Sequence, residues 1–291
     1  MQRTSSEEFA AERVTRLVGE RYRLGQLLGL GAMGSAWAAF DEITGTPVVL
    51  KVHEEGFDGP DADLALQRFL REAETLASVS HENVCRLIAS GTDDVTGEAY
   101  LVLERLEGET LFDACGGRPC DPSWGVSIVA DVARGLEAVH EAAILHRDIK
   151  PQNVVLHRAE GRLVPKIIDF GLARPTRPRV PLTAGRVAVG TPGYMAPEQA
   201  RGLPDLDPRI DVYALGVTLY EMLTGALPVE GTTGMDLMIA TVTTTPTPVR
   251  AHRPELSEAF EGVLMRALAT ERDDRFDNAA QLARALLSVS P

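Results

Sequence analysis

The chain has few basic residues for its length. Its 291 residues include 29 Lys and Arg against 42 Asp and Glu, which gives a formal net charge of −13. A protein that follows a nucleic-acid backbone or an anionic membrane surface needs the opposite balance, so we expect neither partner. Any phosphate bound here must be held by local cations and backbone N–H groups against an unfavourable overall field. A bound metal ion would add local positive charge and so help to hold the phosphate.

Cysteines and long apolar segments are also scarce. The cysteines Cys85, Cys115 and Cys120 are odd in number and lack the paired spacing of zinc sites, so neither a disulfide framework nor a metal site is indicated. Cys115 and Cys120 are either small apolar side chains or a redox pair. The N-terminus has no signal-peptide core, and no apolar run approaches the roughly 18 residues of a membrane span. We expect a cytoplasmic location for the chain as given. In a longer parent chain, a membrane anchor could follow Pro291.

The length and a hydrophobic content of 44% are enough for two unequal lobes around a cleft. Residues 1–18 predict a helical leader. Residues 19–104 predict short strands with one helix near 61–79, followed by a charged hinge at 105–109 and a larger, mainly helical lobe at 110–291. The expected fold is α+β, with a small antiparallel sheet in the first lobe.

Three glycines stand in the segment LGLGAMGSAW, at Gly29, Gly31 and Gly34. This spacing also occurs in dinucleotide-binding turns, but there a strand leads into a helix. Here the glycines lie between two strand-like runs. A strand, a glycine turn and a returning strand form a flap whose N–H groups can close over phosphates. A plain glycine-rich hairpin is the alternative.

Lys51 ends the apolar run VVLK, where an unpaired lysine is costly. The following helix offers Glu72, which is flanked by apolar residues, as the partner of Lys51. The alternative is that Lys51 and Glu72 are two exposed charges on a solvated face, and Glu74 is also available as a partner. A buried ion pair of Lys51 would fix a cation at bound phosphates.

The segment HRDIKPQN combines side chains suited to phosphoryl transfer. Asp148 can accept a proton from a substrate hydroxyl, Lys150 can meet the transferring phosphoryl group, and Asn153 can hold a cation. The later DFG supplies Asp169 as a second cation ligand after the apolar run 164–168. Amide and carboxylate oxygens suit Mg²⁺, a hard cation.

The ordered set LGLGAMG, VVLK, HRDIKPQN, DFG, GTPGYMAPE and DVYALG resembles the eukaryotic-like Ser/Thr protein kinases of bacterial type, over residues 20–288. The resemblance implies ATP and Mg²⁺, with Mn²⁺ possible, as cofactors and protein Ser/Thr hydroxyls as acceptors. It assigns Lys51 to the α- and β-phosphates with Glu72 as partner, and Lys150 to the γ-phosphate. It implies that Asp148 is the catalytic base and that Thr191 forms hydrogen bonds with both Asp148 and Lys150. Asn153 and Asp169 are implied to be metal ligands.

The same resemblance implies structural and nucleotide-binding roles. Glu198 is expected to pair with Arg275, and Asp211 to anchor the catalytic loop through backbone hydrogen bonds. The family's regulatory stack corresponds to Leu76, Leu87, His146 and Phe170. Leu103 is expected to be the gatekeeper. Glu104 and Leu106 are expected to offer hinge backbone groups to adenine. The residues implied to form the cofactor pocket are Ala36, Val49, Leu103, Glu104, Leu106 and Val155.

Two positions depart from the family pattern. Ala36 stands where Val is usual, and Val49 where Ala is usual, and both are expected to touch adenine from one side. One change loses about two methyl groups and the other gains about two, so the volume is conserved by exchange. We interpret this as a repacked ATP pocket with an altered inhibitor profile.

The segment 172–190 is rich in arginine and has no acidic residue. The family pattern predicts phosphorylation of Thr183, with Thr176 as the second candidate. Arg147 and Arg174 would then bind the phosphate and order this loop. A transient homodimer would permit autophosphorylation in trans. A solvated basic loop that selects acidic substrates is the alternative.

Two other functions compete with an active protein kinase. A pseudokinase scaffold usually lacks the strand Lys, the catalytic Asp or the metal-binding Asp, and all three residue types are present here. A small-molecule phosphotransferase is disfavoured because GTPGYMAPE resembles a platform for protein substrates.

Overall fold

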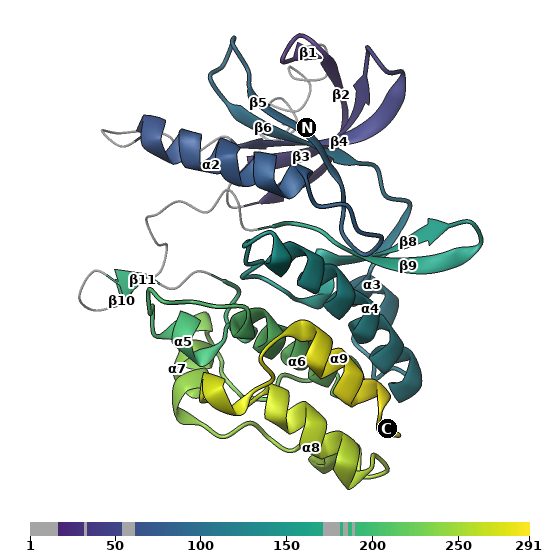
Figure 1. The fold of residues 1–291 in the computed structure, drawn as a ribbon, viewed down its shortest axis with the longest axis vertical. Coiled ribbons are helices and arrows are strands. Elements are labelled where there is room, and N and C mark those ends of the chain that lie inside the picture. Colours follow the sequence, from purple (N-terminus) through teal and green to yellow (C-terminus); the bar gives the residue numbers. More distant parts are fainter. Residues whose placement is uncertain (1–16, 32–33, 54–61, 171–180, 183–185, 188–189) are drawn as a thin grey trace, which may run out of the picture. The chain divides into compact units, whose positions relative to one another are not determined.

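The computed structural model describes residues 17–31, 34–53, 62–170, 181–182, 186–187 and 190–291 (Figure 1). Contacts divide these residues into two compact units. The first unit holds residues up to Ser80 together with Cys85–Leu106, and the second holds His81–Val84 and most of the chain from Glu107 onward. The change of unit between Leu106 and Glu107 lies inside the segment for which we predict a hinge.

The first unit is a six-stranded antiparallel sheet in the order β1-β2-β3-β4-β6-β5. Among its described residues, α2 is the one helix (Figure 1). Short strands joined by tight turns suit such a sheet because neighbouring antiparallel strands need only short connections. The elements are β1 (Leu17–Val18), β2 (Tyr22–Gly31), β3 (Gly34–Asp41), β4 (Thr46–His53), α2 (Ala62–Ala77), β5 (Leu87–Thr92) and β6 (Ala99–Glu104).

Side-chain alternation divides this sheet into two faces. Along β3, buried and half-buried residues alternate strictly, as expected for a period of two. One face carries the core of the unit, in which Trp37, Leu50 and Val102 are fully buried. The buried indole N–H of Trp37 donates to Ser35 Oγ at 2.7 Å. The other face carries the half-buried residues that the sequence assigns to the nucleotide.

The predicted leader helix does not extend to residue 18. Residues 1–16 lie outside the described part, but Leu17 and Val18 form β1, which pairs with Arg23 and Tyr22. The reason is a tight turn at Gly19 and Glu20, both of which have φ of 56°. A left-handed pair reverses the chain and ends helical geometry.

The second unit is larger and mainly helical (Figure 1). Its three-stranded antiparallel sheet has the order β7-β8-β9, and β10 pairs with β11 separately. With the sheet of the first unit, this confirms the predicted α+β fold. The elements are β7 (Gly108–Thr110), α3 (Leu111–Cys115), α4 (Pro122–Glu141), η1 (Pro151–Asn153), β8 (Val154–Ala159), β9 (Arg162–Ile167), β10 (Pro181–Leu182), β11 (Arg186–Val187), α5 (Pro197–Ala200), α6 (Arg209–Thr224), α7 (Gly234–Thr243), η3 (Val249–Ala251), α8 (Glu258–Ala267), η4 (Arg272–Asp274) and α9 (Ala279–Leu287).

Helices α4 and α6 form the interior of this unit. Thirteen of the 16 residues of α6 are buried, which is typical of a helix enclosed on all sides. Helix α4 begins at Pro122, with the Asp121 side chain accepting from Trp124 N–H, and thus has both a capping acid and an initial proline. These helices support the segment that carries the predicted catalytic residues.

The start of β7 depends on a glycine. Gly108 has φ of 153°, and a Cβ there would lie 2.0 Å from the carbonyl oxygen of Leu156 on β8. No other residue allows this approach. Because β7 begins at Gly108, the last two residues of the predicted hinge 105–109 already belong to a strand.

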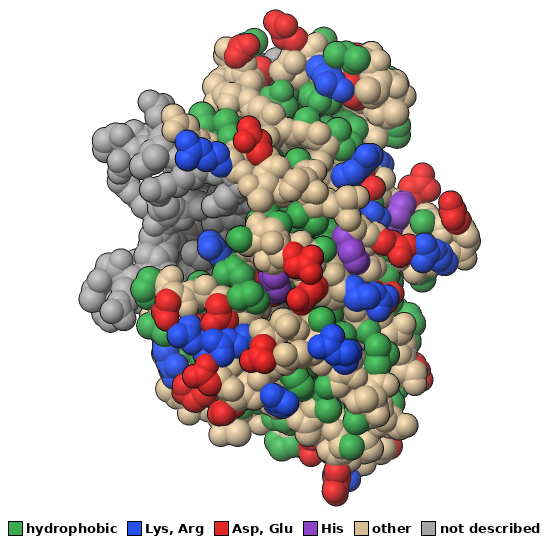
Figure 2. All heavy atoms as spheres, in the orientation of Figure 1, with side chains coloured by type: hydrophobic (Ala, Val, Ile, Leu, Met, Phe, Trp, Pro, Cys, Tyr) green, Lys and Arg blue, Asp and Glu red, His purple; other side chains and the backbone are tan. Residues whose placement is uncertain are grey.

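The described helices include none with the length and apolar content needed to cross a bilayer. Figure 2 shows acidic and basic side chains interspersed over the visible face. In the second unit, Arg209 contacts Asp207 and Asp273, and Arg272 contacts Asp205. Exposed pairs of this kind contribute little to stability individually.

Candidate active site

The glycine segment connects two strands, as its sequence context predicts. Gly29 and Gly31 lie on β2 and Gly34 begins β3, while residues 32–33 are outside the described part. Gly34 has φ of 142°, and a Cβ there would lie 1.9 Å from the carbonyl oxygen of Val52. This close approach of β3 to β4 therefore requires glycine.

Four of the residues assigned to the nucleotide share one face of the first unit's sheet. Directly paired residues point to the same face, and Ala36 pairs with Lys51 while Val49 pairs with Leu103. Ala38 is the other partner of Val49, so Ala36 and Val49 are diagonal neighbours on adjacent strands. Ala36 and Val49 thus lie on one surface, so the larger side chain at position 49 is next to the smaller side chain at position 36.

Lys51 is half-buried on β4. Glu72 belongs to α2, in a stretch where Phe69, Ala73 and Leu76 are buried. The side chain of Glu72 lies outside the described part, so the Lys51–Glu72 pair stays a prediction.

The end of β6 and the strand β8 hold the remaining residues assigned to adenine. Glu104 N–H donates to the carbonyl of Arg86 at 3.0 Å, so the backbone group that Glu104 can offer to a ligand is its carbonyl. Leu106 is the last residue of the first unit. Val155, in the second unit, is half-buried on β8 and pairs with Thr110 and Lys166.

Asp148 is the centre of a polar cluster in the second unit. It is 8% exposed. One carboxylate oxygen accepts from Thr191 Oγ1 at 2.7 Å, and the other accepts from Lys150 Nζ at 3.1 Å. Lys150 Nζ also donates to Thr191 Oγ1 at 2.5 Å. The carboxylate is therefore held from two sides, by Lys150 and by Thr191, which are 41 positions apart in sequence.

Asn153 ties the same loop together. Its amide nitrogen donates to the backbone carbonyl of Asp148 at 2.8 Å and to the carboxylate of Asp148 at 3.1 Å. Because these bonds fix the amide nitrogen, they also fix the opposite, carbonyl oxygen as the side chain's acceptor. An oxygen with a fixed direction suits a hard cation.

Asp169 lies at the neighbouring strand end. Ile168 N–H donates to Asn153 O at 2.9 Å, next to the Val154–Ile167 pair of β8 and β9, so Asn153 and Asp169 are brought close together. Asp169 has φ of 63°, an uncommon conformation for a residue other than glycine. The oxygen types fit a divalent metal ion held partly by phosphates, as Mg²⁺ usually is. In the described part, no three His, Cys, Asp or Glu residues form a metal cluster by themselves.

His146 is buried and neutral. Asp148 N–H donates to its Nδ1 at 3.3 Å, and its Nε2 is 2.9 Å from the carbonyl oxygen of Ile168, so the proton lies on Nε2. Burial lowers the pKa of His146, and the charge of Asp211 opposes that effect only in part. Its ring meets Phe170 edge to face, with centroids 5.0 Å apart. These are the two members of the predicted regulatory stack that lie in this unit; Leu76 and Leu87 lie in the other.

Asp211 holds the backbone of the catalytic loop from α6. Its two oxygens accept from His146 N–H and Arg147 N–H, each at 2.8 Å. Arg147 has φ of 67° and an exposed side chain, and its carbonyl accepts from Gln199 Nε2 at 3.1 Å. The loop is thus held through its backbone on both sides of Arg147, while the guanidinium stays accessible.

Arg275 and Glu198 form a buried bidentate ion pair, with N–O distances of 2.7 and 2.8 Å. Arg275 is 1% exposed and lies over the ring of Tyr213, 5.0 Å from its centroid. Glu198 belongs to α5, directly after the segment with Thr191. The pair therefore fixes that segment to the helical interior.

The residues assigned to regulation are only partly described. Thr176, Thr183 and Arg174 lie outside the described part, and of the four only Arg147 is inside it. The phosphorylation switch stays a prediction.

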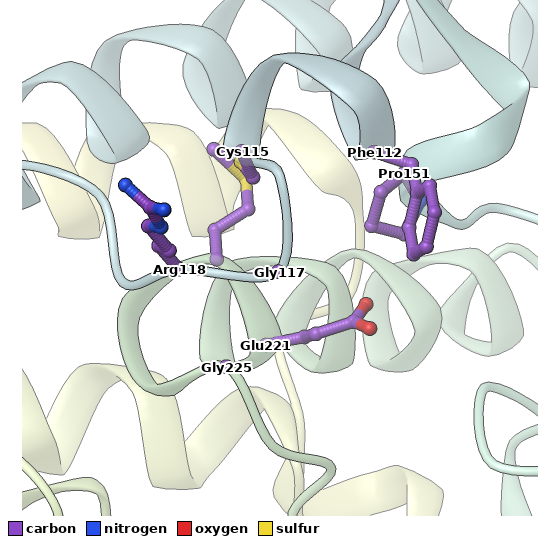
Figure 3. Close-up of a pocket in the computed structure, with 8 residues that line it drawn as sticks. Phe112, Cys115, Gly117, Arg118, Pro151, Glu221 and Gly225 are labelled. Atoms are coloured by element: carbon purple, nitrogen blue, oxygen red, sulfur yellow. The ribbon is translucent and has the colours of Figure 1, made fainter.

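A pocket in the second unit lies beside Pro151 (Figure 3). It encloses about 310 Å³, adjoining solvent included. In Figure 3, Glu221 projects from α6 towards the side of the pocket that carries Phe112 and Pro151, and Cys115 and Arg118 lie at the other side. Glu221 accepts from Tyr194 OH at 2.5 Å, and burial raises the pKa of both groups. Burial also raises the pKa of the Cys115 thiol, and that of Cys120 to about 12, which disfavours reactive thiolates.

Sequence reasoning missed two partners in this region. His140, on α4, has its Nε2 2.8 Å from Asp211 Oδ2, and Tyr194 bonds Glu221. For His140 the available signal was a single histidine after an apolar helix face, four residues beyond Leu136. Such a pattern is also common in ordinary cores, so it did not distinguish a role.

Residues 22–287 match the family model described as protein kinase domain. The chain is 36% identical over 275 residues to serine/threonine-protein kinase Pkn1 of Myxococcus xanthus, covering 93% of this chain and 39% of that protein. It is 32% identical over 281 residues to serine/threonine-protein kinase PknB of Mycobacterium tuberculosis, covering 94% and 43%. The chain thus spans about two fifths of the length of these curated relatives.

The fold is also similar to that of a solved bacterial kinase domain. The crystal structure of the PknI kinase domain of Mycobacterium tuberculosis aligns with a TM-score of 0.74 and 28% sequence identity, over 94% of this chain and 98% of that one. The match thus covers nearly the whole chain, both by sequence and by fold. The chain belongs to the protein kinase domain family, among the bacterial serine/threonine-type members.

Proposed function

We propose that the chain transfers the γ-phosphoryl group of ATP to Ser and Thr hydroxyls of protein substrates. The observation that carries this proposal is the carboxylate of Asp148, held by Thr191 on one oxygen and by Lys150 and Asn153 on the other. A carboxylate with fixed orientation can accept the proton of a substrate hydroxyl as that hydroxyl attacks phosphorus. ATP and a divalent metal ion follow from the family.

Each residue of the cluster has a distinct part in this reaction. Asp148 orients the acceptor hydroxyl and takes up its proton. Lys150 places positive charge beside the γ-phosphoryl group as it is transferred, and Thr191 keeps Asp148 and Lys150 in register. When bound, the metal ion neutralises phosphate charge; Asn153 and Asp169 would hold it, and we propose Mg²⁺ as the ion, with Mn²⁺ as a substitute.

The first unit supplies the nucleotide contacts in this proposal. Gly29, Gly31 and Gly34 leave the backbone of the glycine segment accessible to phosphates, and Lys51, paired with Glu72, contacts the α- and β-phosphates. The adenine contacts come from the apolar sheet face and the end of β6, with Val155 from β8. The residues assigned to them are Ala36, Val49, Leu103, Glu104 and Leu106. Asp211, Glu198 and Arg275 have supporting roles.

Regulation by autophosphorylation is part of the proposal. Thr183, with Thr176 as the second candidate, is the expected site, and Arg147 and Arg174 are the expected phosphate partners. The exposed side chain of Arg147, next to Asp148, supports a link between loop phosphate and catalytic residue. A transient homodimer would allow transfer in trans, and a cytoplasmic location follows from the cysteine usage.

Phosphoryl transfer from ATP tests the function directly. The purified chain is incubated with ATP and Mg²⁺, alone and with a generic basic or acidic protein, beside Asp148→Asn. We expect phosphate on Thr or Ser, mapped by mass spectrometry and missing in the variant. Binding of Mg-ATP without any transfer would favour the pseudokinase scaffold instead.

A further inference from the structure

His157 is a half-buried side chain on β8 that the proposed reaction does not use (Figure 1). Its backbone pairs with Gly108 of β7. Its ring nitrogen Nδ1 lies 3.0 Å from the backbone nitrogen of Glu107 and 3.2 Å from the carbonyl oxygen of Glu107. Glu107 is the first residue of the second unit after Leu106, which is the last residue of the first. The imidazole therefore contacts the backbone where the chain passes from one unit to the other.

The surrounding hydrogen bonds decide which nitrogen of His157 carries the proton. The carbonyl oxygen of Glu107 already accepts from Arg158 N–H at 2.7 Å, whereas the N–H of Glu107 points at Nδ1 and has no second acceptor among the described residues. A lone pair on Nδ1, with the proton on Nε2, gives this N–H its acceptor. A proton on Nδ1 would set two donors against each other. The neutral ring with a protonated Nε2 is thus the form that fits.

This bond fixes a carbonyl group at the end of the first unit. The C=O of Leu106 and the N–H of Glu107 belong to one peptide group, which resonance keeps planar. The peptide is trans, so the two groups point in opposite directions and rotate together. Because Nδ1 of His157 holds the N–H, it also fixes the direction in which the Leu106 carbonyl points. Leu106 is one of the two residues whose backbone groups we expect to bind adenine.

The segment around this peptide needs such an anchor. Strand β6 ends at Glu104 and β7 begins at Gly108, so the residues between them lie outside the strands. The carbonyl of Glu107 belongs to the next peptide group, so the bond from Arg158 orients that group and not the Leu106–Glu107 peptide. Gly108 then has φ of 153° and no side chain to restrict rotation. The acceptor on His157 supplies the orientation that the local backbone does not.

We propose that His157 is a positioning residue for nucleotide binding, which holds the Leu106–Glu107 peptide through Nδ1 and thereby the Leu106 backbone for adenine. The proposal rests on the proposed function, because that function assigns Leu106 to the nucleotide. In this role His157 has no contact with ATP, the metal ion or the acceptor hydroxyl. Its loss should therefore weaken the binding of adenine nucleotides without slowing the transfer step itself.

Two substitutions separate the acceptor of His157 from its bulk. His157→Asn keeps an acceptor oxygen at about the place of Nδ1, and His157→Leu fills a similar volume without an acceptor. Arg158→Leu is the matched control, because Arg158 is the next residue of β8, is exposed and points to the opposite face of the strand. Isothermal titration calorimetry gives Kd for Mg-ATP, transfer to myelin basic protein as a generic basic substrate gives kcat, and thermal unfolding reports folding.

We expect His157→Leu to raise Kd for Mg-ATP about three- to tenfold, the range that one hydrogen bond contributes. At saturating ATP, kcat should stay within about twofold of the parent, because no group that acts in the transfer step is changed. His157→Asn should recover most of the affinity, and Arg158→Leu should retain it. A folded His157→Leu variant with the Kd of the parent would overturn the proposal. Equal increases in Kd for His157→Leu and Arg158→Leu would do the same.

Nuclear magnetic resonance tests the hydrogen bond in the unmodified chain at pH 8, above the usual titration range of histidine, about pH 6.5. The chain has six histidines, so the His157 imidazole is assigned by the signal lost in His157→Asn. We expect Nδ1 to be unprotonated and the amide proton of Glu107 to move upfield in His157→Leu. A proton on Nδ1 would refute the inference. If the unmodified chain binds Mg-ATP and transfers no phosphate, the proposed function fails, while the comparison of Kd values still decides the role of His157.

Discussion

Replacing Arg275 by methionine should destabilise the second unit strongly. The Arg275 side chain is fully buried and makes five hydrogen bonds: two to the carboxylate of Glu198 and one each to the carbonyls of Ala269, Thr270 and Arg209. Methionine has a similar length but no donor. The substitution therefore leaves a buried carboxylate and three carbonyl oxygens without this partner.

Removing one partner of a buried ion pair costs about 3–5 kcal/mol, because the remaining charge is uncompensated. Domains unfold with about 5–15 kcal/mol, so the loss is a large fraction of the total. For a protein of this size each kcal/mol lowers Tm by about 2–4 °C. We therefore expect Tm to fall by about 6–20 °C.

Urea unfolding followed by tryptophan fluorescence measures how Arg275→Met changes the stability of the second unit. The chain has two tryptophans, Trp37 in the first unit and Trp124 in the second. A Trp37→Phe background leaves Trp124 as the reporter for the second unit. Arg134→Met is the control, since the Arg134 side chain is 56% exposed and pairs with Asp131 at the surface, where ion pairs contribute about 0–1 kcal/mol.

Similar small shifts for Arg275→Met and the surface control would refute the reasoning that the buried pair locks the unit. A double variant with Glu198→Gln sharpens the test. Because it removes the uncompensated charge, it should lose less stability than the sum of the single changes.

Three further predictions follow from the same structure. Asp41 has its pKa held well below the usual range by the hydrogen bonds of Arg21, so its stabilisation is complete above about pH 4 and is lost as pH falls below that; Tm measured from pH 5 to pH 3 should fall less in Asp41→Asn than in the parent. Ala36→Val should raise KM for ATP several-fold by crowding the face shared with Val49, and adding Val49→Ala should restore it, whereas additive losses would contradict the volume exchange. Thr183→Ala should lower the rate of transfer after preincubation with Mg-ATP, and an undiminished rate would exclude the loop switch.

The residues that we propose for catalysis could be selected from the sequence because their spacing is local. Asp148, Lys150 and Asn153 lie within six residues. Short strand-like runs likewise predicted the sheet of the first unit, and in that sheet Ala36 and Lys51 share one face while Trp37 lies on the other. The family resemblance then connected these segments, and the relatives bear it out.

The prediction was wrong at the N-terminal boundary for a local reason. A helical pattern was extended through Leu17 and Val18, but Gly19 and Glu20 both adopt positive φ and turn the chain back. Apolar spacing over one turn of helix does not distinguish a helix end from a short strand. Glycine after valine was the available signal.

The sequence by itself determined the family, the order of the elements and the residue types of the site. Only the tertiary structure added long-range partners that neither the residue spacing nor the family resemblance implied. His140 bonds Asp211 across 71 positions, and Tyr194 bonds Glu221 across 27. Each pair joins residues too far apart in sequence for a local helix or strand pattern to predict the contact. Contacts of this kind depend on how α4, α5 and α6 pack, and the direction of each buried polar group is settled only when packing excludes water and leaves it one partner.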